Sequence, residues 1–353
     1  MIRKISAALA VAGLAASAAL IASCLTGTPA ETFSSAASSS GPVVIKIASI
    51  APARSPWDKV LQKVANEWER LSNGSVIVKI FPGGSAGGEQ DMIRKMRLGS
   101  IQGGVFSTMG LAKVDSSMTV LCIPFLFHSR EEFNAVFEQM KPAFEKSIQE
   151  RGFKTIMWTL AGWVNFFSKK PVVTPDDLKA LKISVTSDFP EIEQVWKRMG
   201  YEAVSGDSGD LMIQLQSGAV TALYLPALVA GAGQYFALAP HMLTASLAPL
   251  VGGLIFSEKA WASIPADLHR PFLDAVASVA KGLYDETMDL EADAVKMMKD
   301  NGLITHDAPG AALVKWREAA DQAVSQLLGS VFSKEIYDQI TGYLREYRKA
   351  HGQ

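Results

Sequence analysis

The chain has 353 residues, with 34 Lys and Arg against 35 Asp and Glu, so its formal net charge is −1. This length is sufficient for two lobes. The balanced charge argues against a polyanionic partner such as nucleic acid, which requires a basic surface.

The first 24 residues resemble the leader of a bacterial lipoprotein. Arg3 and Lys4 form a positive start, residues 5–21 are uncharged and rich in Ala and Leu, and small residues precede Cys24. This order is typical of a signal peptide, residues 1–23, which is cut before a Cys that receives lipid. The alternative is an uncleaved anchor helix, because the apolar core approaches the length that spans a bilayer. Both interpretations place the body in a periplasmic or other extracytoplasmic compartment, anchored at a membrane.

The next segment, residues 24–42, predicts a flexible tether. It is rich in Ser, Thr, Ala and Gly, and a chain of this kind reaches roughly 25 Å. If Cys24 carries lipid, Cys122 is left without a partner for an internal disulfide. Because Cys122 lies in an apolar run, we expect it to act as a small core residue.

The first part of the body alternates strands with helices. Apolar runs predict strands at 43–50, 75–80, 101–106 and 153–160, and helical periodicity predicts helices at 56–71, 89–98 and 131–149. Pro142 is expected to break the last of these helices. A strand, a helix and a strand at this spacing predict a βαβ unit, so the sheet should be partly parallel.

The middle of the chain contains a capped turn that leads into a short strand. Asp176 or Asp177 can cap the turn, and the strand 182–186 alternates apolar residues with Ser184 and Thr186. Polar side chains near the ends of such strands carry ligand groups in open α/β sheets. We therefore expect Ser184 to determine what the protein can bind.

The remaining elements complete an α/β pattern that is followed by long helices. Helices are expected at 192–199 and 210–216, and a strand at 219–225. The aromatic residues Trp158, Trp163, Phe166 and Phe167 fall on a predicted strand, turn and strand, and bear on function only if that segment borders a cleft. Residues 266–301 read as almost continuously helical, followed by helices at 311–328 and 334–349. This order predicts an α/β fold of two lobes with a ligand crevice at the strand ends.

Three motifs offer other chemistry. Residues 206–209, Gly-Asp-Ser-Gly, match the nucleophile segment of trypsin-like proteases, but the chain alternates helix and strand and no histidine has a supporting pattern. The Gly-rich loop 82–88 lacks the Lys-Ser/Thr ending of a phosphate-binding P-loop, and a connection near the cleft is the simpler interpretation. The histidines are isolated and no Cys pair is present, so we expect no metal site and no cofactor; the alternative is a cation site made of carboxylate and carbonyl oxygens.

Four segments together resemble one family, the extracytoplasmic solute-binding proteins of TRAP transporters (DctP-like). They are Asn73-Gly74 before a strand, residues 123–127 (Ile-Pro-Phe-Leu-Phe), residues 176–183 (Asp-Asp-Leu-Lys-Ala-Leu-Lys-Ile), and residues 215–220 (Leu-Gln-Ser-Gly-Ala-Val). The resemblance covers about residues 43–301. It implies a two-lobed, periplasmic-binding-protein-like α/β fold with mixed sheets, a hinge and long C-terminal helices. It also implies ligand-driven closure, docking on a membrane permease and no enzymatic activity. The expected lobes are residues 43–161 plus about 250–291, and residues 162–249 plus about 292–353.

The sequence departs from the family pattern at positions that the resemblance assigns to the ligand. An arginine that pairs with a substrate carboxylate is replaced by Ser184, and a second family arginine aligns with Val164. The family's acidic run aligns with residues 221–225 (Thr-Ala-Leu-Tyr-Leu), and a polar cleft position aligns with Ser107. Because a buried carboxylate without its partner costs several kcal/mol, the replacements favour an uncharged or hydrophobic ligand.

The sequence therefore predicts a lipid-anchored receptor that feeds a hydrophobic or uncharged small molecule to a TRAP-type permease. Three alternatives remain: an organic-acid binder in which Arg54 or Lys113 replaces the missing arginine, a ligand-responsive sensor or interaction protein on the same scaffold, and a hydrolase using Ser208. The expected ligand-binding residues are Trp57, Ser107, Phe125, Trp163, Val164, Asn165, Ser184, Thr186, Ser187, Leu223, Tyr224 and Leu225.

Overall fold

The computed structural model describes residues 41–187 and 189–352. The predicted signal peptide, the lipidated Cys24 and nearly all of the tether lie outside the described residues. Within the described part, no helix combines the length and the apolar character needed to cross a membrane.

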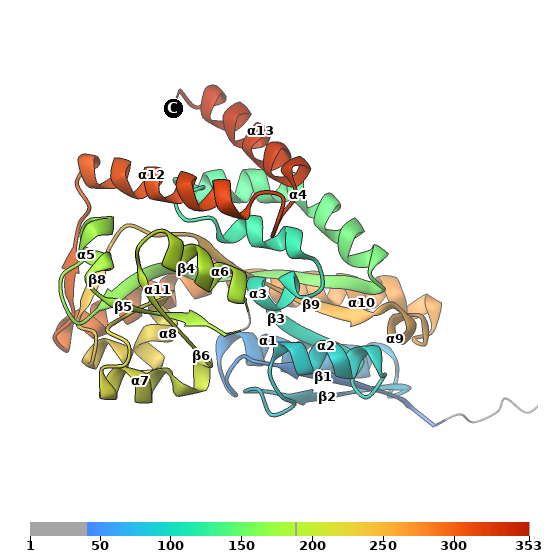
Figure 1. The fold of residues 1–353 in the computed structure, drawn as a ribbon. Helices are drawn as coiled ribbons and strands as arrows, with labels where there is room; N and C mark the ends of the chain where they lie inside the picture. The colour runs from blue at the N-terminus through green and yellow to red at the C-terminus, as the bar shows by residue number, and fades with distance from the viewer. Residues whose placement is uncertain (1–40, 188, 353) are drawn as a thin grey trace, which may run out of the picture. The chain divides into compact units, whose positions relative to one another are not determined.

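The first part of the body is built on strands in the order β2-β1-β3-β9-β4 (Figure 1). Strand β1 runs parallel to β2 and β3, whereas β9 runs antiparallel to β3 and β4. The predicted βαβ unit and the partly parallel sheet are therefore confirmed. The strand bounds are β1 Val43–Ser49, β2 Val76–Phe81, β3 Gly103–Ser107, β4 Phe153–Ser168 and β9 Pro249–Ser257.

Both faces of this part of the sheet are covered, because its strands alternate apolar residues between two cores. One core centres on Trp68, which stacks on Phe272 at a centroid distance of 4.5 Å and donates its indole N–H to the Phe272 carbonyl at 3.1 Å. The opposite core contains Phe106 and the buried aromatic face of helix α4. The covering helices are α1 Pro56–Leu71, α2 Glu89–Arg97, α3 Thr108–Ala112, η1 Ser116–Cys122, α4 Arg130–Glu150, α9 Glu258–Ala262 and α10 Ala266–Ala280.

The second part continues from β4 through β7 and β5 to β6, and β8 joins β4 to β10. Its strands are β5 Lys182–Thr186, β6 Glu202–Gly206, β7 Ala222–Pro226, β8 His241–Leu243 and β10 Ile304–His306. Its helices are α5 Pro175–Lys179, α6 Pro190–Arg198, η2 Ser208–Asp210, α7 Leu211–Ser217, α8 Ala227–Ala232, η3 Tyr235–Ala237 and α11 Leu283–Asp300.

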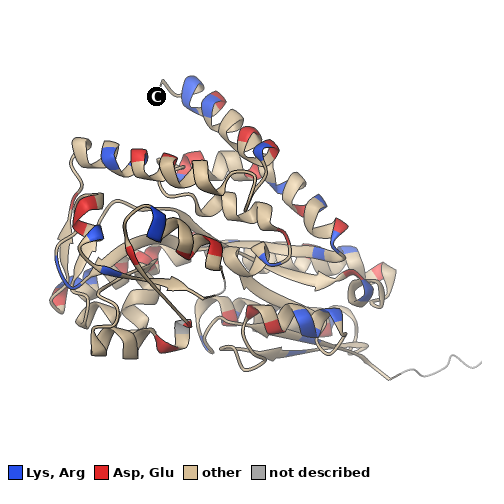
Figure 2. Cartoon of the chain, viewed as in Figure 1, with Lys and Arg blue, Asp and Glu red and all other residues tan. Residues whose placement is uncertain are grey.

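Two C-terminal helices, α12 Gly310–Leu327 and α13 Lys334–Ala350, close the chain. Helix α12 contacts α5 and α6, and α13 contacts α4 (Figure 1). Acidic and basic residues are interspersed along both helices (Figure 2). The apolar side of α12 faces inward, with Trp316, Ala320 and Val324 buried.

Strand β4 belongs to both parts of the sheet. Its first section pairs with β9, and Val164–Ser168 pairs with β7. Two irregularities interrupt the β9 pairing, between Thr155 and Met157 and between Leu160 and Trp163. Gly162 lies at the second irregularity with φ of 119°, in a region that disfavours residues with a Cβ. The prediction of a strand, a turn and a second strand in this segment is therefore wrong. The chain stays in the sheet as one strand and passes through β-bulges.

Three other local expectations need correction. Helix α4 runs through Pro142 without ending, since one lost hydrogen bond is outweighed by the apolar face that packs on both sides of it. The turn before β5 is capped by Thr174 in a capping box with Asp177, rather than by an aspartate alone. The predicted helix 266–301 is divided at Gly282, whose φ of 87° ends one helix and starts the next.

Candidate functional site

A cavity of about 350 Å³ lies where several elements meet. Its walls come from the segment 109–125, from β5, α6 and β7, from residues 247–250 before and within β9, and from α12. This volume is within the range of small-molecule sites. The lining is dominated by aliphatic and aromatic side chains, so the cavity fits an apolar ligand.

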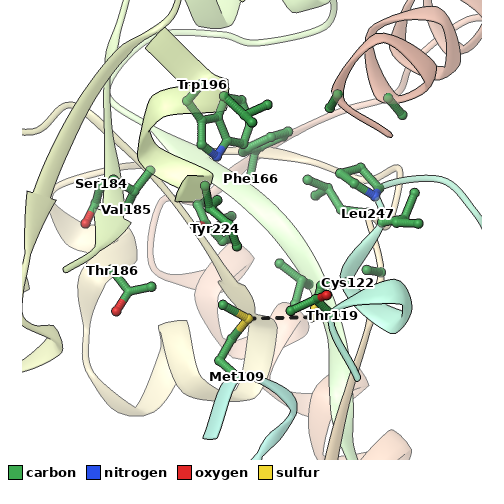
Figure 3. A pocket seen from close by; sticks show the side chains of 18 of the residues that line it. Met109, Thr119, Cys122, Phe166, Ser184, Val185, Thr186, Trp196, Tyr224 and Leu247 are labelled. Atoms are coloured by element: carbon green, nitrogen blue, oxygen red, sulfur yellow. Dashed lines mark hydrogen bonds between the residues drawn. The ribbon is translucent and has the colours of Figure 1, made fainter. Parts of the chain in front are cut away.

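Aromatic rings form the centre of the cavity wall (Figure 3). Phe166 of β4 lies 6.2 Å from Tyr224 of β7 and 5.3 Å from Trp316 of α12, measured between ring centroids. Trp196 of α6 stacks near Tyr224 at 6.3 Å. Elements that are far apart in sequence thus provide one continuous aromatic surface, to which a flat or chain-like apolar molecule can bind by dispersion and by exclusion of water.

The hydroxyls of β5 reach the cavity because the strand alternates its side chains. Ile183 and Val185 are almost fully buried, whereas Ser184 and Thr186 are half-buried and line the cavity. Val164, on the neighbouring part of β4, lines it as well. Ser184 and Thr186 therefore offer hydrogen-bonding groups at the edge of an apolar wall.

Formal charge is scarce on this wall. Among the described residues that line the cavity, Asp207 is the one charged side chain, and none is Lys or Arg. The Asp207 carboxylate accepts a hydrogen bond from the Ser187 hydroxyl at 2.6 Å. Neither Arg54 nor Lys113 lines the cavity, and the Lys113 ammonium lies 3.9 Å from the centroid of the Phe189 ring.

Two weak acids on the wall stay protonated at neutral pH. Burial, with a smaller contribution from Cys122, raises the pKa of Tyr224 to about 12. Burial also raises the pKa of the Cys122 thiol to about 12, and its sulfur lies 3.8 Å from that of Met109 (Figure 3). The cavity therefore presents neutral hydroxyl and thiol groups to a ligand.

The structure brings a subset of the predicted ligand residues together on this wall. They are Phe125, Val164, Ser184, Thr186, Leu223, Tyr224 and Leu225. These residues come from different elements, and their convergence agrees with the predicted crevice. Their contact with a ligand remains a prediction.

The other predicted residues lie outside the cavity, and two of them already have partners. The Ser107 hydroxyl donates to Glu89 at 3.0 Å, and the Asn165 amide donates to the carbonyls of Leu243 and Thr244. A buried polar group held in this way has a structural role. Ser187 is exposed beside Asp207, as described above.

The two predicted tryptophans outside the cavity pack in other places. Trp163 contacts Phe133 at a centroid distance of 6.1 Å, on the core that includes α4. Its backbone N–H donates to Glu291 at 3.0 Å. Trp57 packs against the core on the opposite face of the sheet.

Several lining residues were not predicted from sequence. Trp196 and Trp316 line the wall, and α12 contributes Ala319, Ala320 and Ala323 beside them. The sequence signal was a run of small residues on one side of a helix, which leaves room next to it. That signal could not indicate which surface the helix covers.

The alternative motifs lie where no catalytic arrangement is seen among the described residues. Residues 206–209 lie at the end of β6 and in η2, as a connection to α7. The Gly-rich loop 82–88 links β2 to α2 through Gly83 and Gly84, which have φ of 63° and 71°, and does not line the cavity. Within the described ranges, no group of three or more His, Cys, Asp or Glu side chains is arranged to hold a metal ion.

The sequence profile described as bacterial extracellular solute-binding protein, family 7 (DctP), matches residues 47–330. The chain belongs to this family. A solute-binding protein of Sulfitobacter sp. strain NAS-14.1 is 26% identical over 267 residues, which cover 74% of this chain and 80% of that protein. The 2,3-diketo-L-gulonate-binding periplasmic protein YiaO of Escherichia coli is 26% identical over 170 residues, covering 48% of this chain and 52% of YiaO.

Solved structures of TRAP periplasmic solute-binding proteins share the fold. One from Desulfovibrio salexigens, with bound orotic acid, has a TM-score of 0.78 at 24% identity and covers 87% of this chain and 99% of its own. One from Shewanella oneidensis, with bound succinate, has a TM-score of 0.78 at 17% identity, and the match covers 86% of this chain and 100% of that one. The predicted two-lobed α/β fold of the periplasmic-binding-protein type is thus confirmed.

Proposed function

We propose that this family member captures a small molecule whose body is hydrophobic or uncharged, and delivers it to a TRAP-type membrane permease. The single observation that carries this proposal is the cavity of about 350 Å³, whose described lining contains aromatic and aliphatic side chains and no Lys or Arg. Related proteins of the same fold were solved with acids, namely orotate, succinate and galacturonate. This chain has the same kind of scaffold, and the described lining of its cavity contains no Lys or Arg.

The energetic argument rests on charge burial. A carboxylate moved into this wall would lose its water and meet neutral hydroxyls and the Asp207 carboxylate, which repels it. Burying apolar ligand surface instead contributes about 25 cal/mol per Å². The wall therefore discriminates against small polyanions and in favour of apolar molecules.

We also propose the arrangement around the site. Residues 43–161 with about 250–291 form one lobe, and residues 162–249 with about 292–353 form the other, so ligand binding at their junction favours closure. Cys24 carries the lipid that anchors the protein in the periplasm or another extracytoplasmic compartment, and residues 24–42 act as tether. The protein is a carrier rather than an enzyme, and its partners are the ligand, the permease and the membrane.

Titration with the uncharged fluorescent probe N-phenyl-1-naphthylamine tests the ligand class. We expect saturable, micromolar binding that added apolar alcohols reverse, and no displacement by millimolar succinate, orotate or galacturonate. The variant Ala323→Phe, which places a ring in the cavity, is expected to weaken probe binding at least tenfold.

Ala311→Phe is the matched control, because Ala311 lies on the same helix and is exposed. The proposal fails if a small dicarboxylate binds at micromolar concentration while the neutral probe does not. It also fails if the two alanine variants have equal effects, because probe binding would then not involve the cavity.

A further inference from the structure

A second cavity of about 330 Å³ adjoins the apolar one. It lies between α12 and α13, above the loop 123–128, and we call it the arginine chamber. Its lining includes Arg317, Arg345 and Arg348 together with His128 and Asp321. Its chemistry is therefore opposite to that of the aromatic wall described above.

The three arginines differ in their availability. Arg348 is fixed in the fold, since it donates to the buried Glu132 carboxylate and to the Leu126 carbonyl at 2.8 Å. Arg317 and Arg345 are exposed and make no hydrogen bond or ion pair with another described residue. Two guanidinium groups are thus available, and a guanidinium matches a carboxylate through two parallel hydrogen bonds.

The charge of the chamber suits a single negative group. Arg317 and Arg345 contribute two positive charges, Asp321 contributes one negative charge, and Arg348 is neutralised by Glu132. The pKa of His128 is lowered by burial and by the nearby Arg348 and Arg317, with Glu132 opposing. The positive charges of the chamber therefore disfavour the protonated form of His128.

The two cavities share a wall. Ile123, Pro124 and Phe125 line both from below, and Ala320 and Val324 of α12 line both from above. The side chain of Ala320 is the smallest of those that line both cavities. A molecule in either cavity therefore lies against residues that also line the other.

The loop part of this wall carries backbone strain. Phe125 has φ of 59°, a region that a bulky residue rarely adopts, and its N–H is held by the Leu247 carbonyl at 2.6 Å. Strain of this kind is retained where the surroundings fix it, and it is concentrated at ligand sites.

We infer that the apolar cavity and the arginine chamber form one site for an amphipathic monocarboxylic acid. Its hydrocarbon body fills the apolar cavity, and its carboxylate lies in the arginine chamber on Arg317 and Arg345. This inference rests on the apolar cavity of the proposed function and adds the class of the head group. A cavity of about 350 Å³ is within the range of small-molecule sites, so a medium-length acid is a suitable test ligand.

Decanoate and 1-decanol provide a matched pair of probes, because they share a hydrocarbon body and differ in charge. Displacement of N-phenyl-1-naphthylamine from the full chain measures both affinities, below the micellar concentration of the acid. We expect decanoate to bind about tenfold more tightly than 1-decanol, which is the effect of one charge-assisted hydrogen-bonded pair. Raising the salt concentration should weaken the binding of decanoate and leave the affinity for 1-decanol unchanged.

The double variant Arg317→Gln/Arg345→Gln should reduce decanoate affinity about tenfold and leave that of 1-decanol unaltered. Lys315→Gln/Lys349→Gln is the control, because it removes two exposed charges from the same helices outside the chamber. Both probes should bind this control variant as they bind the unmodified chain. Thermal unfolding of each variant confirms that it is folded.

Each other outcome has a definite meaning. If acid and alcohol bind equally and the arginine variant changes neither, the head-group assignment is wrong while the proposed function stands. Equal losses in the arginine and lysine variants would show a general charge effect and also overturn the assignment. If neither compound displaces the probe, the proposed function and this inference fail together.

Discussion

Ser184 contributes a hydroxyl to the cavity from strand β5, on which its two sequence neighbours Ile183 and Val185 are almost fully buried. Most of the lining around it is aliphatic or aromatic, Thr119, Thr186 and Asp207 add polar groups, and the described lining contains no Lys or Arg. A side chain at this position therefore acts directly on ligand chemistry, while leaving the buried face of β5 untouched.

Ser184→Arg places a long cation in the apolar cavity. Because the long side chain takes up ligand space and brings a charge into a mostly apolar lining in which Asp207 is the one described anionic group, we expect N-phenyl-1-naphthylamine binding to weaken at least tenfold in a fluorescence titration. Ser205→Arg is the control, since Ser205 is exposed on the neighbouring strand β6. Unchanged affinity in Ser184→Arg would place residue 184 outside the ligand site.

At the scale of elements, α13 is tied to α4 by a buried ion pair. Glu132 in the first turn of α4 is fully buried, accepts from Arg348 and also accepts from the His128 backbone N–H. The pair therefore connects the last helix of the chain with a helix that covers the first part of the sheet. Such a pair stabilises the contact mainly through the penalty for breaking it.

Arg348→Ala leaves the Glu132 carboxylate buried without its cation. Loss of one partner from a buried pair costs about 3–5 kcal/mol, which we expect as a decrease in the free energy of unfolding by urea. Arg345→Ala, one turn earlier and exposed, should change this free energy by less than about 0.5 kcal/mol. Equal values for the two variants would show that the pair does not hold α13.

At the scale of the whole body, β4 is a shared strand. It pairs with β9 in one part of the sheet and with β7 in the other, and its bend at Gly162 is held by Glu291 of α11 through the Trp163 N–H. If β4 unfolds, both parts of the sheet lose a strand. The body from Gly41 onward also forms one compact unit.

The shared strand predicts a single cooperative unfolding transition for residues 41–353. Far-ultraviolet circular dichroism and tryptophan fluorescence should give coincident curves, because Trp68 reports on one core and Trp316 on another. Two separated transitions would show that the lobes unfold independently despite β4.

Local signals in the sequence predicted local structure well. Ser55 caps α1, and Gly218, with φ of 74°, ends α7, as the capping patterns indicate. Ser184 and Val164, which the family resemblance rather than periodicity brought together, both line the cavity, and their contact with a ligand remains a prediction. The fold class followed from the alternation of strands and helices.

What could not be predicted depends on contacts between distant segments. Pro142 was expected to break a helix, but α4 continues through it. The packing that keeps α4 helical there comes from other elements, which local sequence does not reveal. Asn165 was assigned to the ligand, although carbonyls nearly eighty residues away occupy its amide. The role of α12 as a wall depends on tertiary packing that helical periodicity does not encode.

The place of α12 in the chain has a consequence for how the protein is made. A ribosome completes residues 109–250, which form the floor and sides of the apolar cavity, long before it reaches residue 310. Until α12 docks, Phe166, Trp196 and Tyr224 lack the helix that covers them, and such a surface binds chaperones or aggregates. A chain truncated before α12 would therefore expose this aromatic surface and lack one wall of the cavity.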